Sequence, residues 1–452
     1  MIPQLNPLLL TDVYNLSHQM LKENTDFEVS HIVNRQLPMV LFGFDTIAHE
    51  VLDYKIYPID IADAATKAKE MGMKFPEELW DRAIAVCGGQ YARIKDLIKI
   101  EALSDGTWCP RNTPFAQISN IKKGFGELVT WWEGVLLHAW FPSACATRAF
   151  EMRQYLDNNK FRSTKFHSFG FRGHQSMESA YWASRAWSLF LLGTDDFNVT
   201  ESHLQASSIP ALAHKVVQNW KVELDCYLEV VKRASEAGYK AISILIDTYS
   251  SKRFIDDYLA IVQDTAKKYD IIPIYRPDSG DVLSQVIKMY WKLIEWKYEP
   301  GKDFAFIIGD SVNFAQAKEY DNELKSQYNI NPDILTWGIG AGFYKDLERD
   351  TLGWSMKTCY SNGRDTMKCT DVEWKRSIPG KVSLNYDING VLRAHTRTKD
   401  SCDNHLYHIL NDQKRLQFGW IKMFANSEQN TAQENIVFSD ALQTKRTLLC
   451  DS

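Results

Sequence analysis

The chain has 452 residues, which is enough for two or three domains with hydrophobic cores of their own. Hydrophobic residues make up 45% and charged residues 24% of the chain, which excludes a disordered or collagen-like protein. The 52 basic and 57 acidic residues give a net charge of −5, unlike the basic balance of a nucleic-acid-binding protein. Any phosphate group must therefore be bound by a local cluster of cations.

Cysteine usage and hydropathy indicate the compartment. The eight cysteines are scattered and form no CxxC pair, as expected for reduced thiols. No stretch approaches the roughly 18 consecutive apolar residues of a membrane span, and the N-terminal residues do not resemble a signal peptide. We therefore expect a cytoplasmic protein that binds neither membrane nor nucleic acid.

The first part of the chain mixes short apolar runs with Gly and Pro breaks. Within it, residues 128–141 (LVTWWEGVLLHAWF) predict a buried helix that ends at Pro142.

The middle of the chain alternates short apolar runs with helical patterns, which indicates βα units. Continuous apolar runs are typical of strands buried on both faces, as in a parallel sheet covered by helices. The expected strands are 241–247, 271–275, 304–308 and 334–337, followed by expected helices over 254–269, 282–297, 312–325 and 344–347.

After residue 352 the pattern changes to short strand-like pieces between Asn-Gly and Pro-Gly turns, which favours antiparallel pairing. We expect this tail to pack against the N-terminal part. The predicted fold is α/β: an incomplete (β/α) barrel-like domain over 149–351, inserted in an α+β domain formed by 1–148 and 352–452.

Polar residues follow the predicted strands, where α/β folds keep their sites. In Arg276-Pro277-Asp278-Ser279-Gly280, the Arg offers a fork to phosphate and the Asp a ligand for a hydroxyl or a metal-bound water. Alone, this motif is more typical of an ordinary turn with a helix cap. Similar turns at Asp247, at 309–311 and at 338–342 together favour a phosphorylated sugar site.

Other candidates are ambiguous when taken singly. Asp195 is as typical of a helix end as of a functional site. Phe169 is as typical of a hydrophobic core, and His214 is as typical of a histidine that only has an ordinary hydrogen-bond partner. The cluster Cys402, His405 and His408 lacks a fourth zinc ligand, so we interpret it as structural.

Taken together and in this order, the motifs resemble the nicotinamide phosphoribosyltransferase family of type II phosphoribosyltransferases, over nearly the whole chain. The segments that carry the resemblance are NPLLLTDVYNLSH, FHSFGFRG, LLGTDDFN, SIPALAH, IDTYS, YRPDSGD, IIGDS, WGIGAGFYKDLERD, SMKTCYSNG and KRSIPGKVSLN. The region after Arg35 is shorter than in the animal members of the family, which indicates a compact bacterial or phage-type member. The resemblance implies that nicotinamide and 5-phosphoribosyl 1-pyrophosphate (PRPP) give nicotinamide mononucleotide and pyrophosphate, the salvage step toward NAD.

The resemblance also implies roles for single residues. Phe169 and Tyr14 of the partner subunit would stack on the pyridine ring, while Asp195 would accept a hydrogen bond from the carboxamide and repel nicotinate. Arg276 would contact the amide oxygen or phosphate region. The ribose and 5′-phosphate would be met by Asp278, Gly309, Asp310, Gly340 and Ala341. The remaining substrate-binding residues would be Asp12, Arg35, His167, Arg172, Arg349, Ser355, Lys357, Lys368, Lys375 and Ser377.

By the same resemblance, His214 would be phosphorylated by ATP beside Asp247, and Asp278 and Asp247 would hold Mg²⁺. His214, Asp278 and Asp247 are thus the expected catalytic residues, in a homodimer whose active sites lie at the interface. Two alternatives stay open: a nicotinate phosphoribosyltransferase on the same fold, and a catalytically silent nucleotide-binding sensor.

Overall fold

The computed structural model describes residues 5–22, 25–199, 206–309, 312–397, 407–408 and 432–451. The chain divides into two compact units, which we describe separately. Unit 1 contains Met1–Thr147 and Leu347–Ser452, and unit 2 contains Arg148–Asp346.

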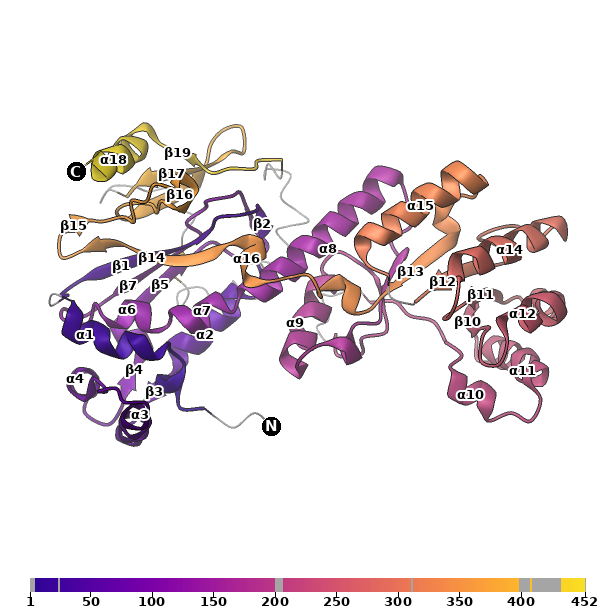
Figure 1. The fold of residues 1–452 in the computed structure, drawn as a ribbon, viewed down its shortest axis with the longest axis horizontal. Helices are drawn as coiled ribbons and strands as arrows, with labels where there is room; N and C mark the ends of the chain where they lie inside the picture. Colours follow the sequence, from indigo (N-terminus) through magenta and orange to yellow (C-terminus); the bar gives the residue numbers. More distant parts are fainter. Residues whose placement is uncertain are drawn as a thin grey trace. The chain divides into compact units, whose positions relative to one another are not determined.

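Unit 2 is built on a six-stranded sheet in the order β10-β11-β12-β13-β8-β9, in which every pairing is parallel. The sheet is curled, and Figure 1 shows β10 to β13 side by side with helices along them. The strands are β8 (Phe166–Ser168), β9 (Gly193–Thr194), β10 (Ala241–Leu245), β11 (Ile272–Arg276), β12 (Ala305–Ile308) and β13 (Leu335–Ile339).

One irregular segment bridges the two edges of this sheet. Ser207 forms a parallel bridge with Gly193 of β9, and Ala211 forms one with Ser243 of β10. The Thr194 N–H donates to the Ser207 carbonyl at 3.0 Å, and the Leu212 N–H donates to the Ser243 carbonyl at 2.9 Å. This segment links β9 to β10 without being a regular strand, so the prediction of an incomplete parallel barrel is confirmed.

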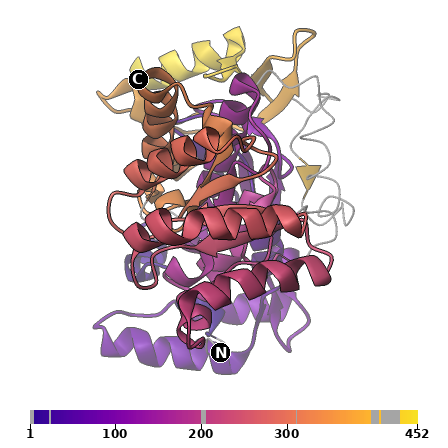
Figure 2. The same ribbon diagram turned by 90° about the vertical axis from the view of Figure 1, so that its right-hand side faces the viewer.

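Helices cover the outside of the sheet in unit 2, and Figure 2 shows several of them in front of the strands. The helices are α9 (Met177–Ser188), α10 (His214–Gln218), α11 (Glu223–Glu236), α12 (Ser251–Arg253), α13 (Leu259–Lys268), α14 (Val282–Glu295) and α15 (Phe314–Tyr328). A π-helical turn, Phe254–Tyr258, precedes α13. The helix expected over 344–347 is wrong: a 3₁₀ helix, Ala341–Phe343, and a turn follow β13, and the next α-helix is α16 (Arg349–Leu352).

Unit 1 contains a six-stranded sheet in the order β15-β14-β1-β7-β5-β18, with antiparallel pairing throughout. The C-terminal strand β14 (Trp354–Ser361) lies beside β1 (Glu28–Asn34), where Met356 is opposite Ile32. Every residue of β1 is buried, as expected for a central strand that is covered on both faces. The other strands are β5 (Ile98–Ala102), β7 (Ala116–Asn120), β15 (Arg364–Asp365) and β18 (Tyr407–His408).

Smaller elements complete unit 1. A three-stranded sheet pairs β16 (Val382–Tyr386) antiparallel with β17 (Leu392–Thr396), and the antiparallel tail is therefore confirmed. β17 also pairs in parallel with β19 (Val437–Phe438). The remaining two-stranded ribbons are β2 (Met39–Val40) with β6 (Trp108–Cys109), and β3 (Lys55–Ile56) with β4 (Ala92–Arg93).

The helices of unit 1 pack beside these sheets. The principal ones are α2 (Phe44–Asp53), α3 (Pro58–Glu70), α4 (Glu77–Val86), α6 (Leu128–Trp131), α7 (Glu133–Leu137) and α18 (Asp440–Asp451). The single helix expected over 128–141 is wrong, because α6 and α7 are separate and α8 (Trp140–Asn159) begins before Pro142. Proline is tolerated in the first turn of a helix, where its missing N–H has no intrahelical partner.

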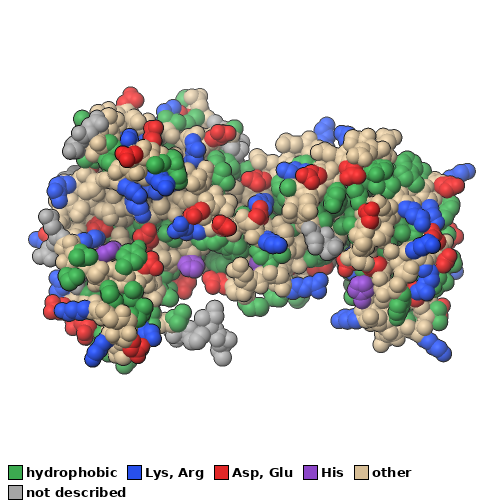
Figure 3. Space-filling model, in the orientation of Figure 1, with side chains coloured by type: hydrophobic (Ala, Val, Ile, Leu, Met, Phe, Trp, Pro, Cys, Tyr) green, Lys and Arg blue, Asp and Glu red, His purple; other side chains and the backbone are tan. Residues whose placement is uncertain are grey.

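The surface mixes both signs of charge. On the face in Figure 3, Lys and Arg side chains are interspersed with Asp and Glu side chains, as the small net charge predicts. No helix within the described ranges is long and apolar enough to cross a membrane.

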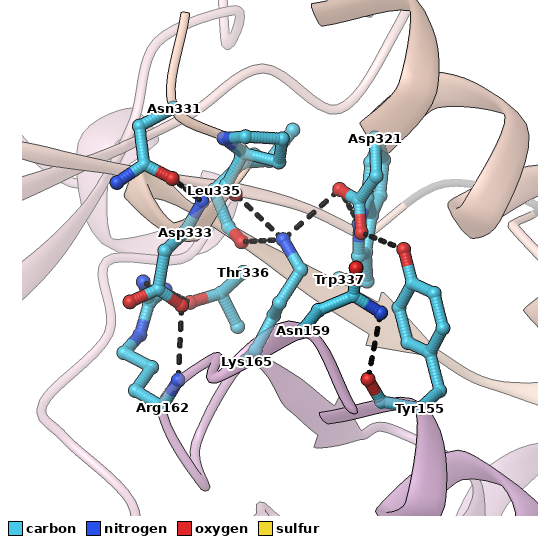
Figure 4. A network of polar contacts seen from close by, with 11 residues as sticks. Tyr155, Asn159, Arg162, Lys165, Asp321, Asn331, Asp333, Leu335, Thr336 and Trp337 are labelled. Carbon is cyan, nitrogen blue, oxygen red and sulfur yellow. Dashed lines mark hydrogen bonds and ion pairs between the residues drawn. The ribbon is translucent and has the colours of Figure 1, made fainter. Parts of the chain in front are cut away.

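A buried polar network joins the amino-terminal ends of β8 and β13 in unit 2 (Figure 4). The fully buried Lys165 donates to the Pro332 and Leu335 carbonyls at 2.6 and 3.1 Å and forms a 2.9 Å ion pair with Asp321. Tyr155 and the Trp337 indole also donate to Asp321, at 2.8 and 2.9 Å. Burial lowers the pKa of Lys165 to about 8, against the opposing effect of Asp321. Each charge is thus compensated, which is the condition for burying an ion pair.

Candidate active site

A cavity of about 560 Å³ lies inside the curled sheet of unit 2. Alternate residues of β11, namely Ile272, Ile274 and Arg276, line it, because successive side chains of a strand point to opposite faces. The strands are therefore covered by helices on one side and line a cavity on the other. His167, Phe169 and Asp195 are near the carboxyl ends of the strands, where the predicted site residues gather.

Phe169 follows β8 and lies against two glycines of neighbouring strand ends. A Cβ atom added at Gly338 would lie 2.2 Å from Phe169 Cε2, and one added at Gly309 would lie 3.1 Å from it. The Phe169 N–H donates to the Ile339 carbonyl at 3.0 Å. Gly338 of β13 and Gly309 after β12 thus make room for the aromatic ring, and Phe169 also lines the cavity.

Asp195 presents a carboxylate at the same cavity. Its Oδ1 atom lies 2.9 Å from His167 Nε2 and accepts a hydrogen bond from Ser208 at 2.5 Å, and its side chain is 40% exposed. Partial burial raises the pKa of Asp195, but the hydrogen bonds from His167 and Ser208 outweigh it and hold the pKa below its usual value. Asp195 is therefore ionised at neutral pH. Ser208 belongs to the bridging segment, which sequence reasoning did not assign to the site.

Arg276 ends β11 beside three carboxylates. It donates to the Leu212 carbonyl at 2.7 Å, while its Nε atom is buried without a partner among the described residues. Burial lowers the pKa of Arg276, against the opposing effects of Asp278, Asp195 and Asp247. An arginine has a pKa so high that it stays charged, and its unused donor is available to an anionic or carbonyl ligand.

His214 and two carboxylates form a second polar group at the strand ends. His214 Nδ1 lies 3.1 Å from Thr248 Oγ1, and Nε2 lies 4.0 Å from an Asp278 oxygen. Ser279 donates a hydrogen bond to Asp247 Oδ2, while Asp247 Oδ1 is buried with no partner in the parts of the chain that the structure describes. The Thr248 contact was not predicted, although Thr248 lies in the DTYS turn.

Among the described residues, no three His, Cys, Asp or Glu side chains are grouped to hold a metal ion by themselves. Asp247 and Asp278 nevertheless fit Mg²⁺, which is commonly held by one or two carboxylates together with substrate phosphates. The unpartnered Asp247 oxygen is an available ligand.

The glycine-rich turn after β13 contacts the turn after β8. A Cβ atom added at Gly173 would lie 3.6 Å from Ala341 Cβ and 2.9 Å from the Tyr344 hydroxyl. Ala341 thus lies near the 3₁₀ helix Phe171–Gly173, which contains the exposed Arg172, and a Cβ atom added at Gly340 would lie 3.8 Å from the Phe169 carbonyl oxygen. Asp310 lies outside the described residues, as do Cys402, His405 and the side chain of His408.

The predicted anion-binding residues of unit 1 form a separate basic cluster. Burial lowers the pKa of Lys357, and the like charges of Arg35, Lys368 and Arg349 act in the same direction. Glu133, which sequence reasoning missed, lies 4.0 Å from the Lys357 amine. Of the described residues, Arg35 Nη2 and Ser355 Oγ are buried polar atoms without partners, so this cluster has unused donors for an anion.

The remaining predicted residues of unit 1 lie around this cluster or are exposed. Burial raises the pKa of Tyr14, and the nearby carboxylates of Glu133 and Asp12 raise it further. Ser377 and Lys368 bond each other: Ser377 Oγ accepts from the Lys368 N–H at 2.7 Å. Lys375 is exposed, with its amine 5.0 Å from the Trp374 ring centre.

The chain is similar in sequence and fold to known phosphoribosyltransferases. Residues 164–373 match the model of the nicotinate phosphoribosyltransferase (NAPRTase) family. The chain is 25% identical over 387 residues to a nicotinamide phosphoribosyltransferase of Xanthomonas campestris, covering 78% of this chain and 80% of that protein. It is 22% identical over 457 residues to one of Acinetobacter baylyi, with coverage of 86% and 90%.

Among solved structures, human nicotinic acid phosphoribosyltransferase has a TM-score of 0.61 at 15% identity, covering 98% of this chain and 100% of that one. A nicotinate-nucleotide pyrophosphorylase from Pyrococcus furiosus has a TM-score of 0.60 at 14% identity, with coverage of 99% and 95%. At these identities the likeness shows a shared fold. The matching family model and the relatives support a type II phosphoribosyltransferase that is similar to the nicotinamide phosphoribosyltransferases.

Proposed function

We propose that this phosphoribosyltransferase uses nicotinamide, forming nicotinamide mononucleotide and pyrophosphate from PRPP in NAD salvage. The pyridine nitrogen forms a bond to ribosyl C1, and the bond from C1 to the pyrophosphate oxygen breaks, with its electron pair leaving on pyrophosphate. Such a displacement needs a positioned ring and stabilisation of the departing charge, and no side-chain nucleophile.

Asp195 is the observation that carries the choice of nicotinamide. His167 and Ser208 both bond its Oδ1 atom, which leaves Oδ2 to accept a hydrogen bond from a carboxamide NH₂. Because the pKa of Asp195 is lowered, the carboxylate is charged at neutral pH and repels the carboxylate of nicotinate. The names of the bacterial relatives support the same substrate.

The pyridine ring requires two apolar faces. Phe169, supported by Gly309 and Gly338, offers one face. We assign the other face to Tyr14 of the partner subunit, whose side chain is 56% exposed in this chain. This assignment makes the enzyme a homodimer with residues of both subunits in each active site.

The phosphate groups of PRPP require cations. Arg276 and Arg172 serve them from unit 2, and the basic cluster around Lys357 serves them from unit 1 of the partner subunit. We propose Mg²⁺ as the cofactor, held by Asp278 and Asp247 together with the pyrophosphate, where it supplies positive charge to the leaving group.

We further propose that ATP phosphorylates His214 and so couples ATP hydrolysis to the transfer. Its 47% exposed side chain is accessible, and Thr248 holds Nδ1, which leaves Nε2 directed toward Asp278. Radiolabel from the γ-phosphate of ATP is expected on the wild type and absent from His214→Ala, which retains a slow ATP-independent reaction. Equal labelling of both proteins contradicts the assignment.

Nicotinate is the second candidate substrate, favoured by the matching family model and by the fold of the human nicotinic acid enzyme. The test is pyrophosphate release from PRPP and Mg²⁺ with nicotinamide, nicotinate or quinolinate. We expect nicotinamide to give the highest kcat/KM. Release with nicotinate alone contradicts the proposal, and no release with any of them favours the nucleotide-binding sensor.

Substitution tests the role of Asp195 directly. Asp195→Ser is expected to lower kcat/KM for nicotinamide and raise the relative use of nicotinate, because the repelling charge and the acceptor are both lost. The exposed Asp225→Ser serves as the matched control and is expected to keep the wild-type ratio. Unchanged selectivity in Asp195→Ser removes the argument for the amide.

A further inference from the structure

The turn after β8 carries two residues of the proposed substrate site, Phe169 and Arg172, but has little regular structure of its own. Its only helical element is the three-residue 3₁₀ helix Phe171–Gly173. Because so short a helix is not stable by itself, the position of the Phe169 ring depends on the hydrogen bonds that the turn makes to other residues.

Asp196 is the residue to which the turn is bonded. Its Oδ2 atom accepts hydrogen bonds from Ser168 at 2.6 Å and from Ser184 of α9 at 3.2 Å. Its Oδ1 atom accepts the Phe171 N–H at 3.0 Å. Ser168 Oγ in turn accepts the Gly170 N–H at 3.3 Å. One carboxylate therefore joins the end of β8, the turn and α9.

The two consecutive acids have different surroundings. Asp195 is 40% exposed and lines the cavity, whereas Asp196 is 4% exposed and lies beneath the turn. A carboxylate suits this place because it only accepts hydrogen bonds, and the three groups that reach it are all donors. Hydrogen bonds to a charged acceptor are also stronger than neutral ones.

The far end of the turn packs against the glycine-rich turn after β13. The His174 ring stacks on Tyr344 with centroids 3.7 Å apart at an interplanar angle of 19°. Gly173 has no room for a Cβ atom beside the Tyr344 hydroxyl. Asp196 thus fixes one end of a turn whose other end is held by ring stacking.

We propose that Asp196 is a positioning residue, which holds the turn so that Phe169 and Arg172 face the substrate. This inference rests on the proposed function only for the role of Phe169 and Arg172 in binding substrate. The hydrogen bonds by which Asp196 holds the turn do not depend on that function. It predicts an effect on every pyridine substrate alike, since the ring of Phe169 does not distinguish an amide from an acid.

The kinetic test uses Asp196→Asn, which keeps the size of the side chain but replaces one acceptor by a donor. We expect the KM for nicotinamide to rise about tenfold, the cost of one lost charge-assisted hydrogen bond. The ratio of nicotinamide to nicotinate use is expected to stay at the wild-type value. A change of selectivity without a change of KM overturns the positioning role.

Two further variants separate positioning from stability. Ser184→Ala removes a bond to the same carboxylate from the α9 side, so it is expected to lower Tm with an unchanged KM. Ser168→Ala removes the bond from the end of β8, just before the turn, and a smaller rise in KM than in Asp196→Asn is expected. If Ser184→Ala raises KM as much as Asp196→Asn does, Asp196 acts through stability alone and the inference is wrong.

Amide hydrogen exchange tests the anchor without relying on activity. In Asp196→Asn, exchange in a peptide that covers residues 168–174 is expected to be about tenfold faster, because the Phe171 N–H then bonds a neutral acceptor instead of a charged one. Ser184→Ala is expected to exchange there like the wild type. Unchanged exchange in Asp196→Asn refutes the anchor even if the enzyme is active. An inactive wild type with the expected exchange instead refutes the proposed function alone.

Discussion

The two units gather their polar residues in different ways. In unit 2, Phe169, Asp195, Asp247 and Asp278 each follow a strand of one parallel sheet, so the topology alone brings them to one edge. In unit 1, Lys357 lies in β14, opposite His31 of β1, which is more than 300 positions away in the sequence. A parallel sheet thus collects residues through a repeated unit, whereas the antiparallel sheet collects them through pairing of distant segments.

The largest effect is expected at the buried base of unit 2, outside the cluster of strand ends. Lys165→Met leaves Asp321 as a buried charge without its cation and is expected to lower the free energy of unfolding by about 3–5 kcal/mol. Denaturant unfolding measures this. The exposed Lys240→Met is the control and is expected to change stability by less than about 0.5 kcal/mol. A small change in the free energy of unfolding for Lys165→Met shows that unit 2 tolerates the loss of the Lys165–Asp321 ion pair.

The next largest effect is expected at the strand ends. Arg276→Ala removes a half-buried cation with an unused donor and is expected to lower kcat about 10²–10³-fold. Steady-state pyrophosphate release measures it. Arg233→Ala, on the exposed face of α11, is the matched control and is expected to have wild-type rates. A loss below tenfold means that Arg276 is a structural residue.

A smaller effect is expected from the basic cluster of unit 1. Lys357→Met is expected to raise the KM for PRPP about tenfold and to weaken its salt dependence, because one phosphate-binding charge is lost. Lys67→Met, an exposed lysine of α3, serves as the control. A KM within twofold of wild type means that the basic cluster of unit 1 does not bind PRPP.

The smallest effect is expected from pH. In the folded protein the pKa of Asp195 lies below its usual value of 3.8, so the carboxylate is charged above pH 3.8. Its negative charge is lost only as the pH falls through the lowered pKa. Relative use of nicotinamide over nicotinate is therefore expected to stay constant between about pH 5 and pH 8, whatever the absolute rates. A change of selectivity with a midpoint in this range contradicts an ionised Asp195.

Much of the fold could be predicted because its signals are local. An apolar run followed by a polar turn predicts each βα unit. The runs at 272–276 and 305–308 are strands in the structure. The errors occurred where tertiary context overrides local pattern. Pro142 was expected to end a helix, but it lies in the first turn of α8, and residues 344–346 form a turn after a 3₁₀ helix.

The candidate site was predicted less completely because its supporting contacts are not local. Ser208 reaches Asp195 from the segment that bridges the sheet edges, and Glu133 reaches Lys357 from α7. Ser208 opens the segment SIPALAH, but neither Ser208 nor Glu133 carries a local pattern that points to a role in the site. Asp196 had no role assigned to it from the segment LLGTDDFN, since two adjacent acids look alike in a sequence.

The parallel sheet of unit 2 and the polar residues after its strands could be predicted, because apolar periodicity and turn composition are encoded within each short segment. Which of these polar groups are buried, paired or left with an unused atom depends on the folded structure. Asp195 and Asp196 are adjacent in the chain, yet only packing gives one of them to the cavity and the other to the turn beneath Phe169. Burial and hydrogen-bond partners depend on every element around a side chain, and those elements come from distant parts of the sequence.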